Sequence, residues 1–423
     1  MVTRRNFFTG AAALVGATAV SRIGAASLPE AASMDSAATQ APLPPPSGRP
    51  YNPVVTLNGW SLPSRMRDGA REFHLVAQPV TQEIAPGMKA NLWGYNGRSP
   101  GPTLEMVEGE RVRIFVTNKL PEPTTVHWHG MPVPNGMDGV AGVTQAAIAP
   151  GDTWQYEFIA RRSGSFMYHP HADDMMQMAM GMMGCIVVHP KDARTMRVDR
   201  DYAFLINAYD IQPGTLVPRV GTMTDFNTWT WNSRVFPGIE PLFALRGERV
   251  RIRIGNLSMD SHPIHLHGHS FEVTGTDGGW VPKSARWPEV TVDVAPGQMR
   301  VIEFIAEETG DWALHCHKSH HAMNAMGHGV PPMLGTDAGE AHATLRSMVP
   351  GYMAMGANGM HEMASMRMPL PDNTLPMMSG QGPYGPIGMG GMFTLLKVRD
   401  RAVQGPLEND WYDCAGAARA RKL

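Results

Sequence analysis

The chain repeats itself, and this internal repeat restricts its possible folds more than any other feature. The segment GERVRI occurs at 109–114 and again at 247–252. A second pair of matching segments lies downstream, IAPGDTWQYEFIA at 148–160 and VAPGQMRVIEFIA at 294–306. Both pairs alternate apolar and polar residues, and APG marks a turn before a strand, so each copy is predicted to consist of short β-strands. The expected fold class is all-β, with two Greek-key sandwich domains.

The composition fits this architecture and excludes some classes of function. Of 423 residues, 43% are apolar and 17% are charged, which is enough to build a core, and 45 Gly with 36 Pro indicate many turns. A formal net charge of −2 gives no support to a nucleic-acid partner. The three cysteines, at 185, 316 and 414, are too few for a disulfide scaffold.

The first 26 residues have the pattern of a signal peptide. Arg4 and Arg5 precede a short apolar run, 11–20, and small residues follow. The paired arginines resemble the twin-arginine signal, which predicts export to the periplasm in a folded state. An uncleaved membrane anchor is the alternative. Residues 27–50 are predicted to be a flexible lead-in, and no later segment is predicted to span a membrane.

Ten of the 17 histidines fall in four short clusters. The clusters are His127-Trp-His129, His169-Pro-His171, His262-Pro-Ile-His265-Leu-His267 and His315-Cys316-His317, the last followed by His321 and Met326. On a strand, an H-x-H pair places both imidazoles on the same side, so two facing pairs can surround metal ions. A thiolate with two imidazoles and a weak axial Met is the ligand set of a blue-copper site.

These four clusters resemble, in order and spacing, the copper signatures of the multicopper oxidases, the family of laccases and bacterial cuprous oxidases. The resemblance covers roughly 51–330 and implies two cupredoxin-like domains and four copper ions. It implies a type 1 copper on His262, Cys316, His321 and Met326, and a type 2 copper on His127 and His265. It implies two type 3 coppers on the remaining cluster residues, His129, His169, His171, His267, His315 and His317.

The internal repeat adds an argument that is independent of the family. Aligning the two copies places Thr124 opposite His262, Pro170 opposite Cys316 and Met175 opposite His321. The first copy therefore lacks the thiolate and both histidines, and a single mononuclear site is predicted, in the second copy. Of the seven histidines outside the clusters, we single out His189, His269, His320 and His328 as left-over histidines, and we expect them to have structural or surface roles.

Asp138, in the segment NGMDGV, is the second candidate catalytic residue, in addition to Cys316. The resemblance implies that it hydrogen-bonds near the type 2 copper and helps to deliver the protons that O₂ reduction consumes. The alternative is an ordinary turn aspartate before Gly139.

Only 90 residues separate His171 from His262, too few for a third sandwich. The predicted domains are 51–192, holding half of the trinuclear copper site, and 193–400, holding the type 1 copper and the other half; 401–423 form a tail. The chain thus resembles the two-domain multicopper oxidases, in which a homotrimer forms each trinuclear cluster between the first domain of one chain and the second domain of the next. A monomer with an intrachain cluster is the alternative.

A methionine-rich insertion is predicted at 327–386, before a closing strand near 387–398 that echoes 179–188. The insertion leaves two candidates for the axial ligand of the type 1 copper. Met326 has the spacing from His321 that the family resemblance implies, whereas Met389 has the implied position relative to the closing strand. Thioethers select Cu(I), so the Met-rich segments, including Met175–Met183, suggest Cu(I) capture. A structural lid is the alternative.

The predicted function is an exported, copper-dependent oxidase that takes electrons singly from a substrate and reduces O₂ to water. Cu(I) is the leading substrate, as part of copper detoxification. A laccase-like enzyme acting on phenols or amines is the runner-up. A copper-containing nitrite reductase and a periplasmic copper-binding protein are more distant alternatives.

Overall fold

The computed structural model of the protein describes residues 51–192, 196–212, 214–224, 226–324, 344, 347–348, 372–375, 380–414 and 420. The predicted signal peptide and lead-in, 1–50, and nearly all of the Met-rich insertion lie outside these residues, as does Met326. No helix within the described ranges is long and apolar enough to cross a membrane.

The all-β prediction is confirmed. The described residues form mainly strands and turns; a short helix, α1 (Asp174–Ala179), lies in the first domain, and residues 344 and 347–348 are also helical. Four single 3₁₀ turns are η1 (Asn135–Met137), η3 (Lys283–Ala285), η4 (Ser319–Ala322) and η5 (Leu407–Asn409).

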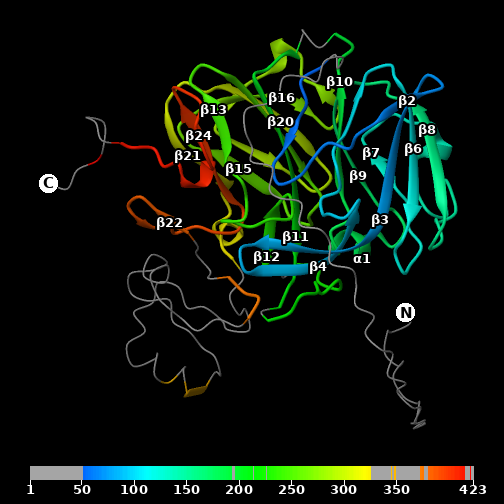
Figure 1. Ribbon diagram of the computed structural model, residues 1–423, viewed down its shortest axis with the longest axis horizontal. Coiled ribbons are helices and arrows are strands. Elements are labelled where there is room, and N and C mark those ends of the chain that lie inside the picture. The colour runs from blue at the N-terminus through cyan, green and yellow to red at the C-terminus, as the bar shows by residue number, and fades with distance from the viewer. Residues whose placement is uncertain are drawn as a thin grey trace, which may run out of the picture. The chain divides into compact units, whose positions relative to one another are not determined.

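The first sandwich consists of two sheets (Figure 1). One sheet contains β2 (Arg65–Arg67), β3 (Ala70–Ala85), β6 (Arg111–Asn118) and β8 (Thr153–Ile159), with β4 (Met88–Tyr95) paired to β3. The other contains β5 (Leu104–Val107), β10 (Gly184–His189), β9 (Gly164–His169) and β7 (His127–His129). The parallel pairs β3·β6 and β5·β10 join strands distant in sequence, as Greek-key connections do.

The second sandwich has the same plan. One sheet follows the order β1 (Val55–Thr56), β11 (Arg200–Tyr209), β14 (Arg249–Asn256), β20 (Met299–Ile305), β16 (Phe271–Thr276) and β17 (Gly279–Trp280), with β12 (Thr228–Trp231) and β18 (Pro288–Glu289) attached. The other follows β13 (Leu242–Leu245), β24 (Phe393–Arg399), β21 (Gly310–Cys316), β15 (His262–Leu266) and β19 (Thr291–Val294). A small hairpin pairs β22 (Gln381–Gly382) with β23 (Gly385–Pro386).

The sequence repeat has a structural counterpart in the turns of the two domains. In the first domain, the Asn118 carbonyl accepts a hydrogen bond from the Gly151 amide at 2.8 Å, while the Asn118 side chain donates to the Ile148 carbonyl at 2.9 Å. In the second domain, Asn256 makes the equivalent bonds, to the amide of Gly297 and the carbonyl of Val294, at 2.8 Å each. Each asparagine thus anchors the APG turn of its own copy.

The closing strands also correspond. In the first domain β10 pairs in parallel with β5 and antiparallel with β9. In the second, β24 pairs in parallel with β13 and antiparallel with β21. The last strand of the second sandwich therefore follows the methionine-rich segment in sequence, as the echo of 179–188 at 387–398 predicts.

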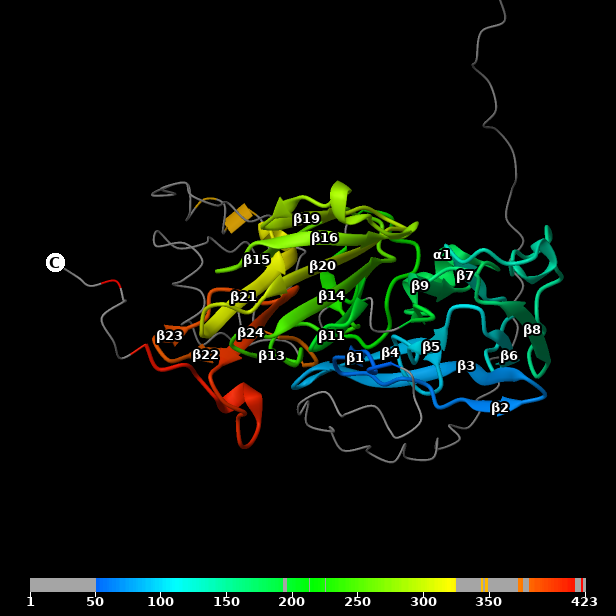
Figure 2. The same cartoon turned by 90° about the horizontal axis from the view of Figure 1, so that it is seen from above.

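Within one chain the two sandwiches share a packed interface. An apolar cluster joins β9 and β10 of the first to β11 and β20 of the second, with Met167, Cys185, Leu205 and Met299 among its buried members. β9 contacts β14 and β20 directly, and Figure 2 shows it on the side of the first sandwich nearest to them. The long β3–β4 hairpin adds a second cluster against the segment that follows β11.

A buried ionic network lies in this interface. The guanidinium of Arg253 on β14 makes two bonds of 2.7 Å to the Asp201 carboxylate on β11 and donates at 2.6 Å to the Ser165 hydroxyl on β9. Arg251 also reaches Asp201, at 3.1 Å. Two arginines, Arg251 and Arg253, thus pair with the buried Asp201 carboxylate, and these charge-assisted hydrogen bonds offset the free-energy cost of burying the charge.

We expect Arg253→Met to destabilise the folded protein strongly, because it leaves Asp201 buried with half of its partners. Breaking a buried ion pair costs roughly 3–5 kcal/mol, and the remaining Arg251 contact places the loss near the lower end. Equilibrium denaturation measures it. The matched control is Arg246→Met, whose exposed pair with Asp400 contributes at most about 1 kcal/mol. Equal losses in both variants would contradict a stabilising role for the buried network.

Candidate metal centre

Three predicted ligands meet inside the second sandwich. His262 begins β15, Cys316 ends β21, and His321 lies on η4. The Cys316 Sγ is 3.6 Å from the Nδ1 of each histidine, and the two Nδ1 atoms are 3.1 Å apart. All three side chains are buried. We call His262, Cys316 and His321 the mononuclear set.

Strand alternation explains how Cys316 enters the core while its neighbours do not. On β21, Cys316 pairs with Ile264 of β15, and both side chains belong to the core of the second sandwich. His315 and His317 are displaced by one residue and therefore take the opposite face. The Cys316 amide donates to the Met392 carbonyl, and the Met392 amide donates to the His321 carbonyl, so the segment before β24 fixes this loop.

Burial sets the protonation states of the mononuclear set. Desolvation lowers the pKa of His262 to about 3, and desolvation together with the adjacent His262 lowers the pKa of His321 to about 2. Both rings are therefore neutral, as metal ligands must be. Desolvation raises the pKa of the Cys316 thiol to about 11, so the protein alone does not hold the thiolate, and a bound cation is required to ionise it.

The Nε2 atoms of His262 and His321, which face away from Cys316, have different surroundings. The Nε2 of His262 hydrogen-bonds to the Ser258 hydroxyl at 2.8 Å, which leaves its Nδ1 facing Cys316. The Nε2 of His321 is buried and has no hydrogen-bond partner among the described residues. Instead, Trp229 stacks on that ring, with centroids 4.4 Å apart and planes 18° apart. Neither Ser258 nor Trp229 could be identified from the sequence, because both lie outside the four clusters.

The donor set fits copper. One thiolate and two imidazoles in a closed, apolar pocket are the ligands of a blue-copper site, which a weak axial thioether completes. Of the two axial candidates, Met326 lies outside the described residues. Met389 is half-buried and precedes Gly390, whose amide donates to the Ala322 carbonyl at 3.0 Å, so the chain at Met389 passes close to η4.

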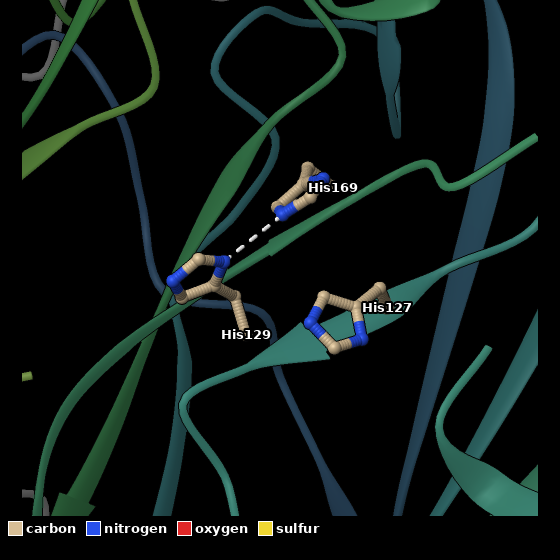
Figure 3. A group of neighbouring side chains, drawn as sticks. All are labelled: His127, His129 and His169. Carbon is tan, nitrogen blue, oxygen red and sulfur yellow. Dashed lines mark hydrogen bonds between the residues drawn. The ribbon is translucent and has the colours of Figure 1, made fainter. Parts of the chain in front are cut away.

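A second group of predicted ligands lies on the first sandwich (Figure 3). Strand β7 pairs with β9 so that His127 faces His169, while Trp128 points into the core. Ring centroids in this group are 5.4–6.2 Å apart. We call it the first histidine set: His127, His129, His169 and His171.

Hydrogen bonds orient the rings of the first histidine set. The Asp138 carbonyl lies 2.8 Å from His127 Nδ1, and the Pro170 carbonyl lies 2.9 Å from His169 Nδ1, so in both rings the Nε2 is left for a metal. The Nδ1 of His129 faces His169 Nε2 at 3.2 Å (Figure 3). Burial lowers the pKa of His169 to about 4 and also lowers the pKa of His129. His129 and His169 are therefore neutral at pH 7.

A matching group lies on the second sandwich. β15 and β21 pair His265 with His315, as β7 and β9 pair His127 with His169. His267 Nε2 lies 3.1 Å from His315 Nε2, and burial lowers the pKa of both rings. Ring centroids are 4.7–5.7 Å apart. We call it the second histidine set: His265, His267, His315 and His317.

The two histidine sets remain separate in the described part of the chain. Each close ring contact among these eight residues joins two members of one set. His267 and His317 are exposed, and His265 is half-exposed. His315 is buried, so three of the four rings of the second set are accessible at the surface of a single chain.

In the first sandwich, two hydrogen-bonded polar side chains, Thr124 and Gln177, lie at the position equivalent to the mononuclear set. Thr124 bridges to Ile148 as His262 pairs with Val294, so the predicted equivalence of Thr124 and His262 has a structural basis. The Thr124 hydroxyl donates to the Gln177 side chain at 2.7 Å, and both residues are fully buried. Gln177, rather than the exposed Met175, thus lies beside Thr124. The alignment of the copies did not find Gln177, since α1 has no counterpart of the same length after His317.

The left-over histidines lie outside the three ligand sets. His189 is buried against Glu105, 2.8 Å from its carboxylate, and stacks on Tyr51. His269 is buried near Trp312, and His320 is exposed with its ring edge toward Trp229. His328 lies outside the described residues.

Comparison with known proteins agrees with the geometry. Two sequence profiles, both described as multicopper oxidase, match residues 77–193 and 213–332, which together exceed half of the chain. The chain is similar in structure to the blue copper oxidase of Nitrosomonas europaea, at 25% identity and a TM-score of 0.58, over 77% of this chain and 85% of that one.

Two curated relatives are longer than this chain. A probable nitrite reductase–hydroxylamine oxidoreductase fusion protein of Kuenenia stuttgartiensis is 29% identical over 62% of this chain and 31% of its own length. Copper resistance protein A of Escherichia coli is 33% identical over 39% of this chain and 27% of its own. The match thus spans about a third or less of each relative.

We expect Cys316→Ser to abolish the intense blue absorption of the copper-loaded protein and its turnover with every reducing substrate, because the serine oxygen cannot replace the thiolate. Absorption spectra and steady-state assays measure this. The control is Cys185→Ala, since Cys185 is buried on β10 and burial raises the pKa of its thiol to about 12. That variant should keep the spectrum. A Cys316→Ser protein that stayed blue would overturn the assignment of Cys316.

Proposed function

We propose that this chain, which belongs to the multicopper oxidase family, is a copper-dependent oxidoreductase that oxidises a one-electron donor and reduces O₂ to water. The observation that carries this proposal is the position of Cys316 between His315 and His317. At one strand end, Cys316 belongs to the mononuclear set on the core side, while His315 and His317 belong to the second histidine set on the opposite face. A nitrite reductase or a copper store does not require that combination.

We assign the copper ligands as follows. The mononuclear set, completed by Met326 or Met389, would hold type 1 copper, His127 and His265 type 2 copper, and the other six histidines a type 3 pair, giving four coppers. When bound, copper supplies reversible one-electron chemistry at the first site and O₂ binding at the other three.

The chain itself contributes a short connection between the sites. Cys316 and its neighbours His315 and His317 are joined by single peptide units, and the His315 Nδ1 lies 2.9 Å from the Cys316 carbonyl. The thiolate and the outer ligands are thus linked through a few covalent bonds inside a packed sandwich. Burial of Cys316 and His262 keeps water from this connection.

Asp138 has two roles in the proposal. Its carbonyl accepts from His127 Nδ1, which orients that ring, and its carboxylate lies 3.4 Å from the same nitrogen. The side chain is about one-third exposed. A partly solvated carboxylate beside a ligand of the O₂ site can take protons from water and pass them inward, which the reduction of O₂ requires.

We propose Cu(I) as the physiological donor, in copper detoxification by a protein exported through the predicted twin-arginine signal to the periplasm. The name of the E. coli relative and the methionine content of 327–386 support this. The six methionines in 175–183 support Cu(I) binding less than their number suggests, because Met180, Met182 and Met183 are buried in the interior. Of these six, Met175 is the exposed one. A laccase-like oxidation of phenols remains the second candidate.

Deleting 353–368 tests the donor. If the thioethers of this segment deliver Cu(I), we expect Cu(I) oxidation to fall far more than phenol oxidation, measured as O₂ uptake with each donor. The matched control replaces the six methionines between 353 and 368 with leucine, which keeps length and volume but removes the soft ligand. It should reproduce the loss. Equal losses on both donors would favour a structural role for the segment.

We propose that the O₂ site forms between chains of a homotrimer. Each chain provides four histidines on each of two sandwiches, and neither set holds enough ligands for three ions. The apolar and ionic interface fixes the two sandwiches of one chain relative to each other, and His265, His267 and His317 of the second histidine set are accessible to solvent. A neighbouring chain can cover that set with its own first set. Head-to-tail contacts of this kind either close into a ring or grow into a filament, and we propose a ring of three chains.

Complementation tests the shared site. One chain carries His127→Ala and His129→Ala, and the other carries His265→Ala and His267→Ala, so each alone should be inactive. Co-expressed in equal amounts, they should recover about a quarter of wild-type activity, because a random ring pairs an intact first set with an intact second set at one interface in four. A fully active, fully copper-loaded monomer would instead establish an intrachain cluster.

A further inference from the structure

The two imidazoles of the mononuclear set differ in the hydrogen bonding of their outer nitrogens. The Ser258 hydroxyl donates to the Asn256 side-chain carbonyl at 2.8 Å, and His262 Nε2 lies 2.8 Å from the same hydroxyl oxygen. A hydroxyl has one hydrogen, so this oxygen accepts from an N–H on His262 Nε2. The Nδ1 of His262, 3.6 Å from Cys316 Sγ, is then the unprotonated nitrogen that a metal can use. His262 thus has a fixed tautomer and a hydrogen-bond acceptor.

His321 has no such acceptor. Its Nδ1 faces Cys316 Sγ at 3.6 Å, so a ring that binds metal there carries its hydrogen on Nε2. In the described part of the chain this Nε2 is buried without a hydrogen-bond partner. The ring is stacked instead on the indole of Trp229, with centroids 4.4 Å apart and planes 18° apart. A stacked ring offers no lone pair in the plane of the imidazole, so the buried N–H stays unpaired, which costs free energy.

The stack keeps water away from His321. Trp229 lies on β12, whose four residues are all buried, and β12 pairs with β11. The exposed fraction is 0% for His321 and 7% for Trp229. His320 is edge-on to both rings, with centroids 4.3 Å from His321 and 5.5 Å from Trp229, and it is the exposed member of the three. Water that reaches His320 is thus excluded from the ring of His321.

Hydration of His321 affects the two oxidation states of a bound copper unequally. With one thiolate and two neutral imidazoles, the site has one more positive charge as Cu(II) than as Cu(I). A dry, apolar shell disfavours the more charged state, whereas an acceptor on the outer N–H of a ligating histidine stabilises it by raising the basicity of the ring. The negative face of the indole attracts positive charge and acts in the opposite sense. That attraction is limited, because the imidazole bears only part of the charge of the ion.

We propose that Trp229 is a positioning residue that raises the reduction potential of the mononuclear site, because it holds His321 dry and without a hydrogen-bond acceptor. His262, by contrast, keeps its acceptor in Ser258. The proposal rests on the proposed function, which places copper on the mononuclear set. It adds a determinant of the first electron transfer that lies outside the ligands: a higher potential makes the site a stronger acceptor for the electron of the donor.

An anaerobic redox titration of the blue absorption of the copper-loaded, full-length protein measures this potential without turnover. In Trp229→Ala, water can enter the space left by the indole and accept from the Nε2–H of His321. We expect the ratio of Cu(II) to Cu(I) at a fixed applied potential to rise about tenfold, the lower end of the effects typical of outer partners of metal ligands, which is a midpoint about 59 mV lower for a one-electron couple.

The matched control is Trp231→Ala, on the same strand. Trp231 is also fully buried, with an Nε1 that lacks a partner among the described residues, but its ring packs on Phe204 with centroids 4.6 Å apart. This variant should lose comparable packing and keep the wild-type potential. An unchanged or higher potential in Trp229→Ala, or an equal fall in the two variants, would overturn the proposal.

A second variant tests the same cause with the opposite sign. Ser258→Ala removes the acceptor from His262 and leaves both outer N–H groups unpaired, so the potential should rise. A general loosening of the site would move Ser258→Ala and Trp229→Ala in the same direction, and that result would contradict the proposal. If Trp229→Ala does not fold, Trp229→Leu replaces it, with Trp231→Leu as the control, because leucine has no ring to cover the imidazole. The same selective fall is expected, and its absence would refute the role of Trp229.

The wild-type protein separates failure of this inference from failure of the proposed function. A wild-type chain that shows no blue absorption after loading with copper would refute the assignment of the mononuclear set, and with it the function. A blue wild-type chain whose potential is the same as that of Trp229→Ala would refute only the role of Trp229.

Discussion

The pairing of β15 with β21 is the constraint on which the rest of the site depends. Side chains of a strand alternate between its two faces, so a cysteine between two histidines must send its sulfur one way and both imidazoles the other. The inward face is the core of the second sandwich, where burial keeps His262 and His321 neutral and the thiol protonated in the absence of metal. The outward face is open to solvent at His317. Two chemically different sites thus share one strand end.

Much of the fold and of the ligand groups could be predicted from the sequence, because both follow local rules. The repeated APG and GERVRI segments encode strand alternation and turns, and the all-β class is confirmed. The H-x-H spacing predicts side chains on a common face, and the structure gathers His127, His129 and His169 in one group and His262, Cys316 and His321 in another. These assignments as copper ligands stay predictions, as do the domain boundaries.

The remaining features depend on tertiary contacts that have no sequence signature. Trp229 reaches His321 from β12, and Ser258 reaches His262 from the loop after β14; neither residue belongs to a motif. Gln177 fills the position beside Thr124 because α1 follows His171, and no periodicity in that methionine-rich run indicates which side chain turns inward. The sequence does not choose between Met326 and Met389 as axial ligand, because an insertion lies between His321 and the closing strand. Spacing from His321 favours Met326, whereas position relative to the closing strand favours Met389.

Strand β1 affects how independent the two repeats can be. Val55 and Thr56 precede the whole first sandwich in sequence, yet they pair in parallel with Tyr202 and Ala203 on β11 of the second. The second sandwich therefore takes part of its sheet from the far end of the chain. Severing the chain between the sandwiches would strip β11 of this neighbour and expose backbone groups at a sheet edge, which invites pairing with other molecules. The two halves repeat each other in sequence, but in the folded chain they are not separable modules.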